Sequence, residues 1–307
     1  MSQYSVGGYQ IAVMARSGKT LLVEGKDDRL VVQRVLLEPV LGGPIGRKVR
    51  VDSTELVRDD VVQGKGARDK VLYLADRLRF LEGKVKGLVD REWEFFCTET
   101  YIERPEHDFG GNVFITRGHS IENYFFSPDI CCDFLKEKHA STISPELLDQ
   151  VEESFSRIVK FAFSYSVACR RLGLIDRLDN FISPRHLIWD VDFSCDEQFA
   201  LDLRRRGVSD QLAVSLVSLI KEISVDIETL RVSELCGRWN AHGHLGGDAV
   251  WACIGRIAAS HGASPAEADQ ICHGYRDDRL KASAHVFARN LNEEAVPFDS
   301  IIRWAHS

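Results

Sequence analysis

Acidic side chains follow two short apolar segments in the first third of the chain. Glu24 comes directly after Thr20–Val23, and Asp90 comes directly after Val85–Val89, with Glu92 two residues further on. In an open α/β sheet, ligands bind outside the carboxyl ends of the strands, where the loops meet. Carboxylates are ligands that Mg²⁺ prefers, with waters and substrate phosphate completing its coordination. The spacing therefore predicts a site for Mg²⁺, or for Mn²⁺ in its place, formed by Glu24, Asp90 and Glu92.

A metal site of this kind favours in-line cleavage of a phosphodiester bond. One or two Mg²⁺ ions would polarise the phosphate and neutralise the developing charge, and Glu24 could accept a proton from the nucleophile. Glu122 could be a fourth acid near the metal, or it could belong to a structural turn. Lys26 and His119 are candidates for contacts with substrate phosphate.

The clearest basic cluster is a run of three arginines, Arg204, Arg205 and Arg206. Such a run could contact the phosphates of a nucleic acid or a partner protein. A run of cations at the end of a helix also interacts favourably with the helix dipole. Both interpretations stay open at this point.

The elements that must position these residues alternate in type along the first part of the chain. Buried strands are predicted over Thr20–Val23, Arg47–Val51, Val85–Val89 and Asn112–Thr116, and helices over Asp28–Leu37 and Ala67–Leu81. Alternation of strand and helix is typical of a mostly parallel α/β sheet flanked by helices. The segment Arg91–Gly111, between the third and fourth strands, is expected to be a hairpin or a loop.

After about residue 127 the pattern changes to helices. Four Ser-Pro pairs offer a capping serine followed by proline in the first helical turn. Helices are predicted over Glu146–Leu172, Cys195–Arg206, Asp210–Ile227, Asp248–Ala259 and Pro265–Cys272. The expected fold is thus an α/β sheet domain over residues 1–127 followed by an all-α domain over residues 128–307.

Composition limits the possible functions. The chain has 39 basic and 46 acidic residues and a net charge of −7, which excludes a protein that coats nucleic acid with a globally basic surface. The eight cysteines include no C-x-x-C pair, which argues against a zinc site, and without a secretory signal reduced thiols are expected. No apolar run reaches the roughly 20 residues of a membrane span, and residues 1–10 lack the core of a signal peptide. We therefore expect a cytoplasmic protein with no membrane partner.

The segment LLVEGKDD, followed by a strand ending in D-R-E, resembles the Toprim domain of topoisomerases, primases and OLD-type nucleases. That domain has a glutamate after its first strand and a D-x-D motif after its third. The resemblance assigns these roles to Glu24, Asp90 and Glu92, where Glu92 departs from the usual second aspartate. It implies that residues 1–127 form a Toprim catalytic domain.

Further motifs are similar to a narrower group, the AriB-type Toprim effectors of the PARIS anti-phage system. These are S-I-E-N-Y at residues 120–124, H-G-H-L-G-G-D at residues 242–248, and S-x-Y-S-V-x-G-Y near the start. The resemblance implies a metal-dependent nuclease, toxic to the cell, that an ABC-type ATPase of the AriA kind holds inactive. A phage trigger protein would release it to cleave RNA, with tRNA as the substrate class. A homodimer would follow if two sites act on one substrate.

Two other functions fit the same residues. The chain could be a different Toprim enzyme, related to primases or topoisomerases, although it shows no zinc-binding module and its helical half is small for strand passage. It could also be a non-enzymatic sensor or regulatory subunit of an ATPase complex, whose acids bind a nucleotide or only stabilise the fold.

Overall fold

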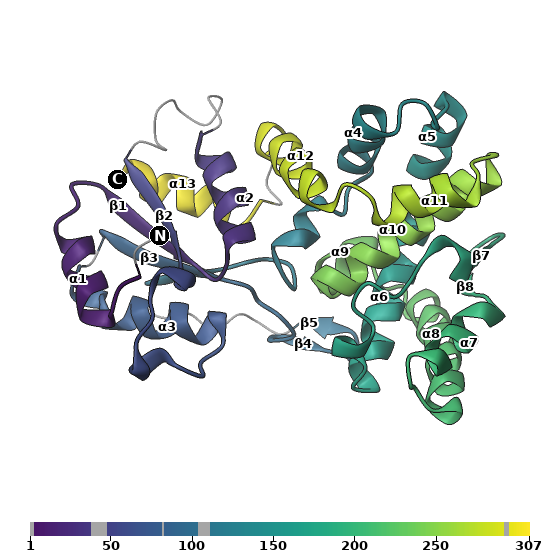
Figure 1. Cartoon of the computed structure of the whole chain (residues 1–307), viewed down its shortest axis with the longest axis horizontal. Helices are drawn as coiled ribbons and strands as arrows, with labels where there is room; N and C mark the ends of the chain where they lie inside the picture. Colours follow the sequence, from purple (N-terminus) through teal and green to yellow (C-terminus); the bar gives the residue numbers. More distant parts are fainter. Residues whose placement is uncertain (1–2, 38–47, 82, 104–110, 292–294) are drawn as a thin grey trace. The chain divides into compact units, whose positions relative to one another are not determined.

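The computed structural model describes residues 3–37, 48–81, 83–103, 111–291 and 295–307 (Figure 1). The chain divides into two compact units. The first, called the sheet unit below, comprises Met1–Arg91, Pro105–Arg117 and Leu280–Ser307; the second, the helical unit, comprises Glu92–Arg104 and Gly118–Arg279. These units do not follow the predicted boundary at residue 127, because the last part of the chain packs with the sheet and a short segment after Arg91 packs with the helices.

The sheet unit is built on four parallel strands, which confirms the predicted fold class. The order is β2-β1-β3-β6, and the strands are β1 (Lys19–Val23), β2 (Val49–Ser53), β3 (Val85–Val89) and β6 (Val113–Ile115). Leu22 pairs with Asp52 of β2 and with Gly87 of β3. From β1 the chain runs to β2 on one side of β1, and it then crosses to β3 on the other side of β1. The junction of β1 and β3 is therefore the switch point at which α/β sheets bind ligands.

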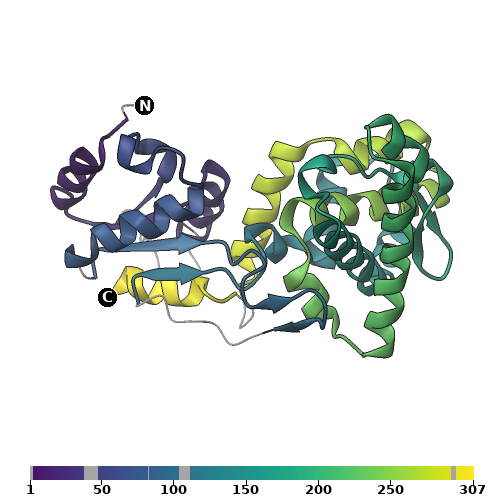
Figure 2. The same ribbon diagram turned by 90° about the horizontal axis from the view of Figure 1, so that it is seen from below.

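Helices cover both faces of this sheet. Leu22, Val85 and Val89 face α1 (Val6–Met14) and α3 (Ala67–Arg77), with which they share one apolar core. Side chains alternate between the faces of a strand, so Leu21 and Val23 point to the other face. That face is covered by α2 (Lys26–Leu37) and α13 (Phe298–His306), and Figure 2 shows α13, in yellow, on the opposite side of the sheet from α1 and α3.

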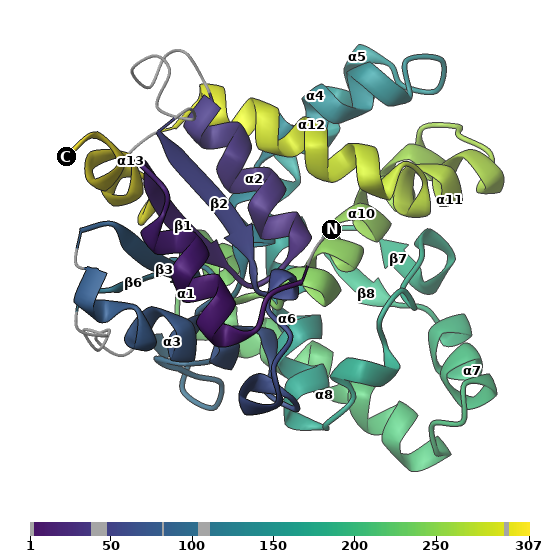
Figure 3. The same cartoon turned by 60° about the vertical axis from the view of Figure 1, so that its left-hand side comes forward.

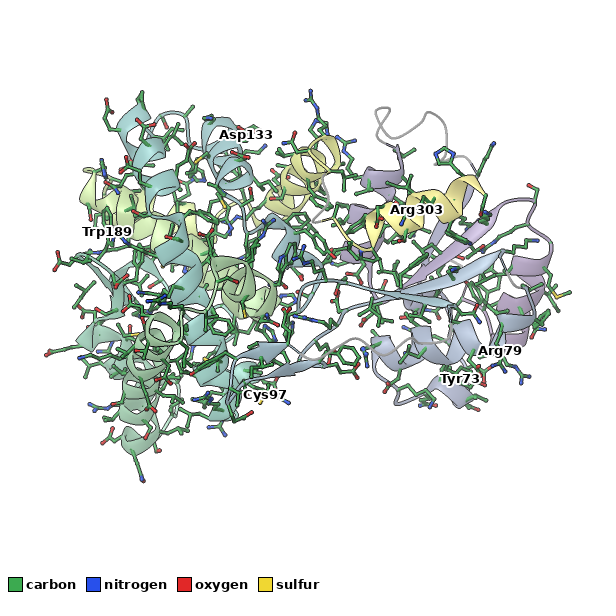
Figure 4. All side chains as sticks on the ribbon, turned by 180° about the vertical axis from the view of Figure 1, so that it is seen from behind. Tyr73, Arg79, Cys97, Asp133, Trp189 and Arg303 are labelled. Carbon is green, nitrogen blue, oxygen red and sulfur yellow. The ribbon has the colours of Figure 1, made fainter. Side chains whose placement is uncertain are left out.

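Helix α13 belongs to the sheet unit although it lies far along the chain. Trp304 Nε1 donates to the carbonyl oxygen of Gly83 at 2.9 Å, and its ring packs on Phe114 of β6. Lys19 Nζ donates to the carbonyl of Trp304 and to Ser307 Oγ. Arg303 lies on the exposed side of the helix (Figure 4), where it pairs with Asp299.

Three short 3-10 helices complete the described elements of the sheet unit: η3 (Thr54–Leu56), η4 (Asp60–Val62) and η5 (Arg79–Leu81). Strand β2 starts and ends two residues later than predicted, and Arg47 lies outside the described residues. The strand continues because Asp52, only 1% exposed, accepts hydrogen bonds from Tyr9, Arg16 and Arg50. A carboxylate inside a strand breaks the apolar pattern from which strand ends are predicted.

The helical unit is centred on α6 (Phe155–Arg171) and α10 (Gly243–Ser260), which pack against each other and are mostly buried. The other elements around them are α4 (Pro128–Lys138), α5 (Pro145–Glu153), α7 (Glu197–Arg205), α8 (Asp210–Thr229), α9 (Glu234–Asn240), α11 (Pro265–His273), η6 (Ile121–Phe125), η7 (Ile175–Arg177), η8 (Pro184–His186), β4 (Phe96–Cys97), β5 (Ile102–Glu103), β7 (Leu187–Trp189) and β8 (Phe193–Cys195). Helix α12 (Arg276–Arg289) contains the boundary between the units.

The helical predictions hold in outline and fail at several ends. The segment Glu146–Leu172 is two helices, because α5 ends at Glu153 and α6 begins at Phe155. Cys195 belongs to β8, and α7 begins only after Asp196, whose side chain caps it. Helix α10 begins five residues before the predicted Asp248, so the glycine-rich segment is helical and not a connection.

All eight cysteines are free thiols, as expected, and five of them are buried. Burial raises the pKa of Cys131 and of Cys132 to about 12, which keeps both thiols protonated near neutral pH. In the part of the chain that the structure describes, no helix is both long enough and apolar enough to span a bilayer.

Candidate active site

The structure brings Glu24 and Asp90 together at the switch point of the sheet. Glu24 follows β1 and Asp90 follows β3, and these two strands are neighbours. The backbone N–H of Asp90 donates to Glu24 Oε1 at 2.8 Å, so the Glu24 side chain reaches across to the end of β3. The strand-end reasoning thus placed two of the predicted acids at one position in the fold.

Side chains from the neighbouring elements hold this edge of the sheet in place. Thr54, just after β2, donates its hydroxyl to the carbonyl oxygen of Glu24 at 2.7 Å. Arg68, in the first turn of α3, donates Nε to the carbonyl oxygen of Asp90 at 3.0 Å. Thr116, just after β6, accepts the N–H of Arg91 at 2.9 Å. Every strand of the sheet therefore contributes a polar contact at its carboxyl end.

The turn after β1 is closed by an acid of the following helix. The N–H of Gly25 donates to Asp28 Oδ2 at 2.8 Å, which agrees with Asp28 being a helix-start residue. Lys26, the first residue of α2, is exposed. Its position beside Glu24 in the chain keeps it a candidate for a phosphate contact.

The donors at this edge suit a hard cation. Glu24 and Asp90 supply carboxylate oxygens, and Mg²⁺ is commonly bound through one or two carboxylates with waters and substrate phosphate. Glu24 accepts the Asp90 N–H through Oε1, one of its two carboxylate oxygens. Among the described residues no group of three or more metal-ligating side chains is found. The two carboxylates at this edge are of a type that suits a hard cation.

The other two predicted acids and His119 belong to the helical unit. Glu92 is exposed, its φ of 53° lies in the left-handed region, and its N–H donates to the carbonyl oxygen of His119 at 2.6 Å. His119 is 5% exposed and packs edge-on against Trp93, with ring centroids 4.8 Å apart. A role for Glu92 as the third metal ligand stays a prediction.

A histidine cluster, formed by His119, His242, His244 and Glu122, lies within the helical unit. The ring centroids of His119 and His242 are 4.5 Å apart, and His244 Nε2 lies 3.6 Å from Glu122 Oε1. Gly243 permits this approach, because a Cβ there would lie 1.9 Å from Ser120 Oγ and 2.8 Å from Glu122 Oε2. The sequence segments S-I-E-N-Y and H-G-H-L-G-G-D are therefore packed together.

His242 is the N-cap of α10. Its Nδ1 accepts the N–H of Leu245 at 3.3 Å, which places the proton of the neutral ring on Nε2. Burial, and then the nearby His244, lower the pKa of His242 to about 4. The ring is therefore neutral at physiological pH, as a capping acceptor must be.

The arginine run is engaged within its own unit. Arg204 pairs with Asp210 at 2.6 Å, and Arg205 pairs with Asp202 at 2.7 Å. Arg206 donates to backbone carbonyl oxygens, including that of Arg177, and its guanidinium lies over the ring of Phe181. These contacts agree with a structural role at the end of α7, and contact with nucleic acid stays a prediction.

Three residues that support the site, Thr54, Arg68 and Thr116, were not predicted from the sequence. Thr54 and Thr116 directly follow strands, so the strand-end rule that found Glu24 and Asp90 could also have found them. Arg68 reaches Asp90 from a helix, and no spacing in the sequence indicates that contact.

No protein-family model matches the chain. A search of curated proteins likewise finds no match.

Proposed function

We propose that this protein is a Toprim-type nuclease that depends on a divalent metal ion. The observation that carries the proposal is the pairing of Glu24 and Asp90 at the β1–β3 switch point of a parallel sheet, with Asp90 N–H 2.8 Å from Glu24 Oε1. Both positions match the Toprim motif, and both supply oxygen ligands suited to Mg²⁺. The sequence resemblance supports Glu92 as a further acid of the site.

A bound Mg²⁺ ion would supply the positive charge that polarises the scissile phosphate. Glu24 and Asp90 would hold the ion and thereby orient the phosphate against the sheet edge. The hydrogen bonds from Asp90 N–H, Thr54 and Arg68 fix the segments that carry both acids, so little rearrangement is needed at the moment of reaction. Lys26 would add a cation for a phosphate oxygen.

The finer parts of the proposal are supported by the resemblance to AriB-type effectors. They are RNA cleavage with tRNA as the substrate class, control by an ABC-type ATPase, release by a phage trigger protein, and action as a dimer in the cytoplasm. Each has its own test, and the cleavage chemistry comes first.

Changing Glu24→Gln or Asp90→Asn should abolish cleavage while the fold is kept. The purified proteins are incubated with end-labelled tRNA and with a DNA of equal length, in Mg²⁺ or in EDTA. Removal of a metal ligand should lower the cleavage rate by about a hundred-fold or more, as loss of a group that stabilises transition-state charge does. EDTA should have the same effect on the unchanged protein.

The matched control is Asp27→Asn, which removes an exposed acid from the same segment. This variant should cleave at close to the unchanged rate. Cleavage that survives both Glu24→Gln and EDTA would overturn the proposal. Binding of Mn²⁺ at Glu24 without cleavage of any nucleic acid would favour the regulatory-subunit alternative.

A further inference from the structure

A basic hollow lies at the amino ends of β1 and β2, in the sheet unit. Its volume is about 820 Å³, within the range of ligand-binding pockets. It is formed by the turn before β1, one side of α2 and the start of β2, the elements labelled β1, α2 and β2 in Figure 3. Five cations line it: Arg16, Lys19, Arg29, Lys48 and Arg50.

No carboxylate is found among the described residues that line the hollow. The acid bonded to its cations is Asp52, which accepts from Arg16 Nη1 at 2.6 Å and from Arg50 Nε at 2.9 Å. Asp52 is 1% exposed, so its charge lies beneath the surface that a ligand would meet. Among the described residues, five cations and the buried Asp52 give the hollow a net positive charge, although the net charge of the chain is −7.

Several of these cations are already held in position. Arg16 is fixed by Asp52 and by Thr20 Oγ1, 2.9 Å from its Nη1. Lys19 is anchored at Ser307 Oγ. Partial burial, and then the charge of Lys86, which lies outside the hollow, lower the pKa of Lys19. The cations of the hollow are thus placed by contacts within the sheet unit before any ligand binds.

The lining indicates which anion is recognised. No aromatic ring is among the described lining residues, so bases find no stacking platform there. Arginine and lysine side chains contact phosphates without reading sequence. The cations come from three separate segments, which suits an extended chain of phosphates better than one small anion.

The hollow extends from the amino end of β1 toward the first turn of α2. Strand β1 runs over five residues from Lys19 to Val23, so at about 3.3 Å per residue the Lys19 end of the hollow lies roughly 17 Å from Glu24. Arg29 is nearer, because its N–H donates to the carbonyl oxygen of Gly25 at 3.2 Å. A nucleic acid that contacts both ends of β1 would contact the Lys19 end about five nucleotides from the cleavage site, at about 3.4 Å per nucleotide. Lys19 and the other cations at the amino ends of the strands are therefore separate from Glu24 and Asp90.

We propose that the basic hollow binds the phosphate backbone of the nucleic acid that the carboxylate edge of the same sheet cleaves. The identity of the ligand rests on the proposed nuclease function. The hollow itself rests on its cations, its volume and the absence of aromatic lining among the described residues.

The test is RNA binding measured without cleavage. Affinity of the full chain for a labelled tRNA is measured by fluorescence anisotropy in EDTA over a range of salt concentrations. The variant Arg29→Glu/Lys48→Glu reverses two exposed or half-exposed cations of the hollow. Its Kd should rise about tenfold or more at roughly 0.15 M salt, and the slope of log Kd against log salt should fall by about 1.4, since each phosphate contact contributes about 0.7.

The matched control is Lys65→Glu/Arg77→Glu, which makes the same change of charge on exposed residues outside the hollow. Lys65 lies over the ring of Tyr73, which is labelled in Figure 4. It should leave Kd within about twofold and the salt slope unchanged. The neutral variant Arg29→Gln/Lys48→Gln should show an intermediate loss of RNA affinity. It controls for misfolding caused by the reversed charges.

Equal binding by the hollow and control variants would overturn the proposal. Binding of inorganic phosphate at the hollow that leaves RNA binding unaffected would also overturn the proposal, because that result identifies a small-anion site. Since binding is measured in EDTA, its outcome is independent of cleavage. Intact RNA binding without any nuclease activity would overturn the proposed function and leave the RNA-binding hollow standing.

Discussion

At the scale of single residues, His242 couples the stability of α10 to pH. In the unfolded chain a histidine has a pKa near 6.5, whereas in the folded protein burial and His244 lower it to about 4. The unfolded chain therefore binds a proton that the folded protein does not bind between these two pH values. This contribution to stability is complete above about pH 6.5 and is lost as the pH falls toward 4.

Replacing His242→Asn should remove this pH dependence while keeping the cap, because asparagine is a favoured N-cap. Glu122, Asp176 and Asp179 oppose the shift, and His244 adds to it. Between pH 7 and pH 4.5 the unchanged protein should lose about 2–3 kcal/mol more than the variant in free energy of unfolding, at about 1.4 kcal/mol per pKa unit. Urea denaturation at several pH values measures this. Parallel stability curves for the two proteins would contradict it.

The residues of the carboxylate edge were within reach of sequence reasoning, and those of the basic hollow were not. Glu24 and Asp90 follow strands whose apolar character marks them, so a local rule is enough. The cations of the hollow are spread from Arg16 to Arg50 and meet only because two strands and a helix pack together. The local run Arg204–Arg206 was more visible in the sequence, yet its side chains are engaged in pairs and carbonyl contacts.

At the scale of elements, a buried asparagine helps to hold η6 to the end of α9, where Arg238 also donates to the carbonyl oxygen of Tyr124. Asn123 Nδ2 donates to the carbonyl oxygens of Arg238 at 2.7 Å and Ala241 at 2.9 Å, and its Oδ1 accepts the N–H of Ser120 at 2.8 Å. Asn123 is fully buried. The S-I-E-N-Y segment is thus a joint between elements, which agrees with the structural-turn interpretation for its asparagine.

The change Asn123→Ala should destabilise the helical unit by about 3 kcal/mol, because it leaves buried carbonyl groups without their donor. Thermal and urea unfolding measure the loss. Asn290→Ala, at an exposed asparagine, is the control and should cost less than about 0.5 kcal/mol. Equal stability of the two variants would show that Asn123 does not hold the joint.

Elements with strong local patterns were predicted well, and those defined by capping or by tertiary contacts were not. Strand β3 has the predicted ends because a short, mostly apolar segment lies between Lys84 and the acid Asp90. Helix α1 was not predicted because it contains two glycines. Its residues Tyr9 and Val13 are buried only by packing against the core of the sheet unit. Helix α10 begins early because His242 caps it, and a glycine-rich sequence by itself argues against a helix.

At the scale of the whole molecule, the sheet unit is discontinuous in sequence. Its last element, α13, buries Phe298, Ile301, Trp304 and Ala305. A prediction based on a change of composition places all helices after residue 127 in one domain. Such a prediction cannot place a helix near residue 300 against a sheet formed before residue 116, because the contacts of Trp304 with Gly83 and Phe114 are long-range.

Replacing Trp304→Ala should destabilise the sheet unit by about 3 kcal/mol or more, as removal of a buried tryptophan side chain does. Trp304→Phe, which keeps an aromatic ring but loses the hydrogen bond to Gly83, should cost about 1 kcal/mol. Hydrogen exchange resolves the location: amides of β1 and β6 should lose protection, whereas those of α6 should keep it. Equal loss in α6 would show that α13 does not act within the sheet unit alone.

The return of α13 to the sheet also has a consequence for how the protein is made. On the ribosome, β1, β3 and β6 are complete long before α13 is synthesised, because Gly118–Arg279 comes between them. At roughly 5–20 residues per second, that stretch takes about ten to thirty seconds to translate. During this time the nascent sheet lacks a helix that covers one of its faces. The unit that bears Glu24 and Asp90 is therefore completed only after the helical unit has been synthesised.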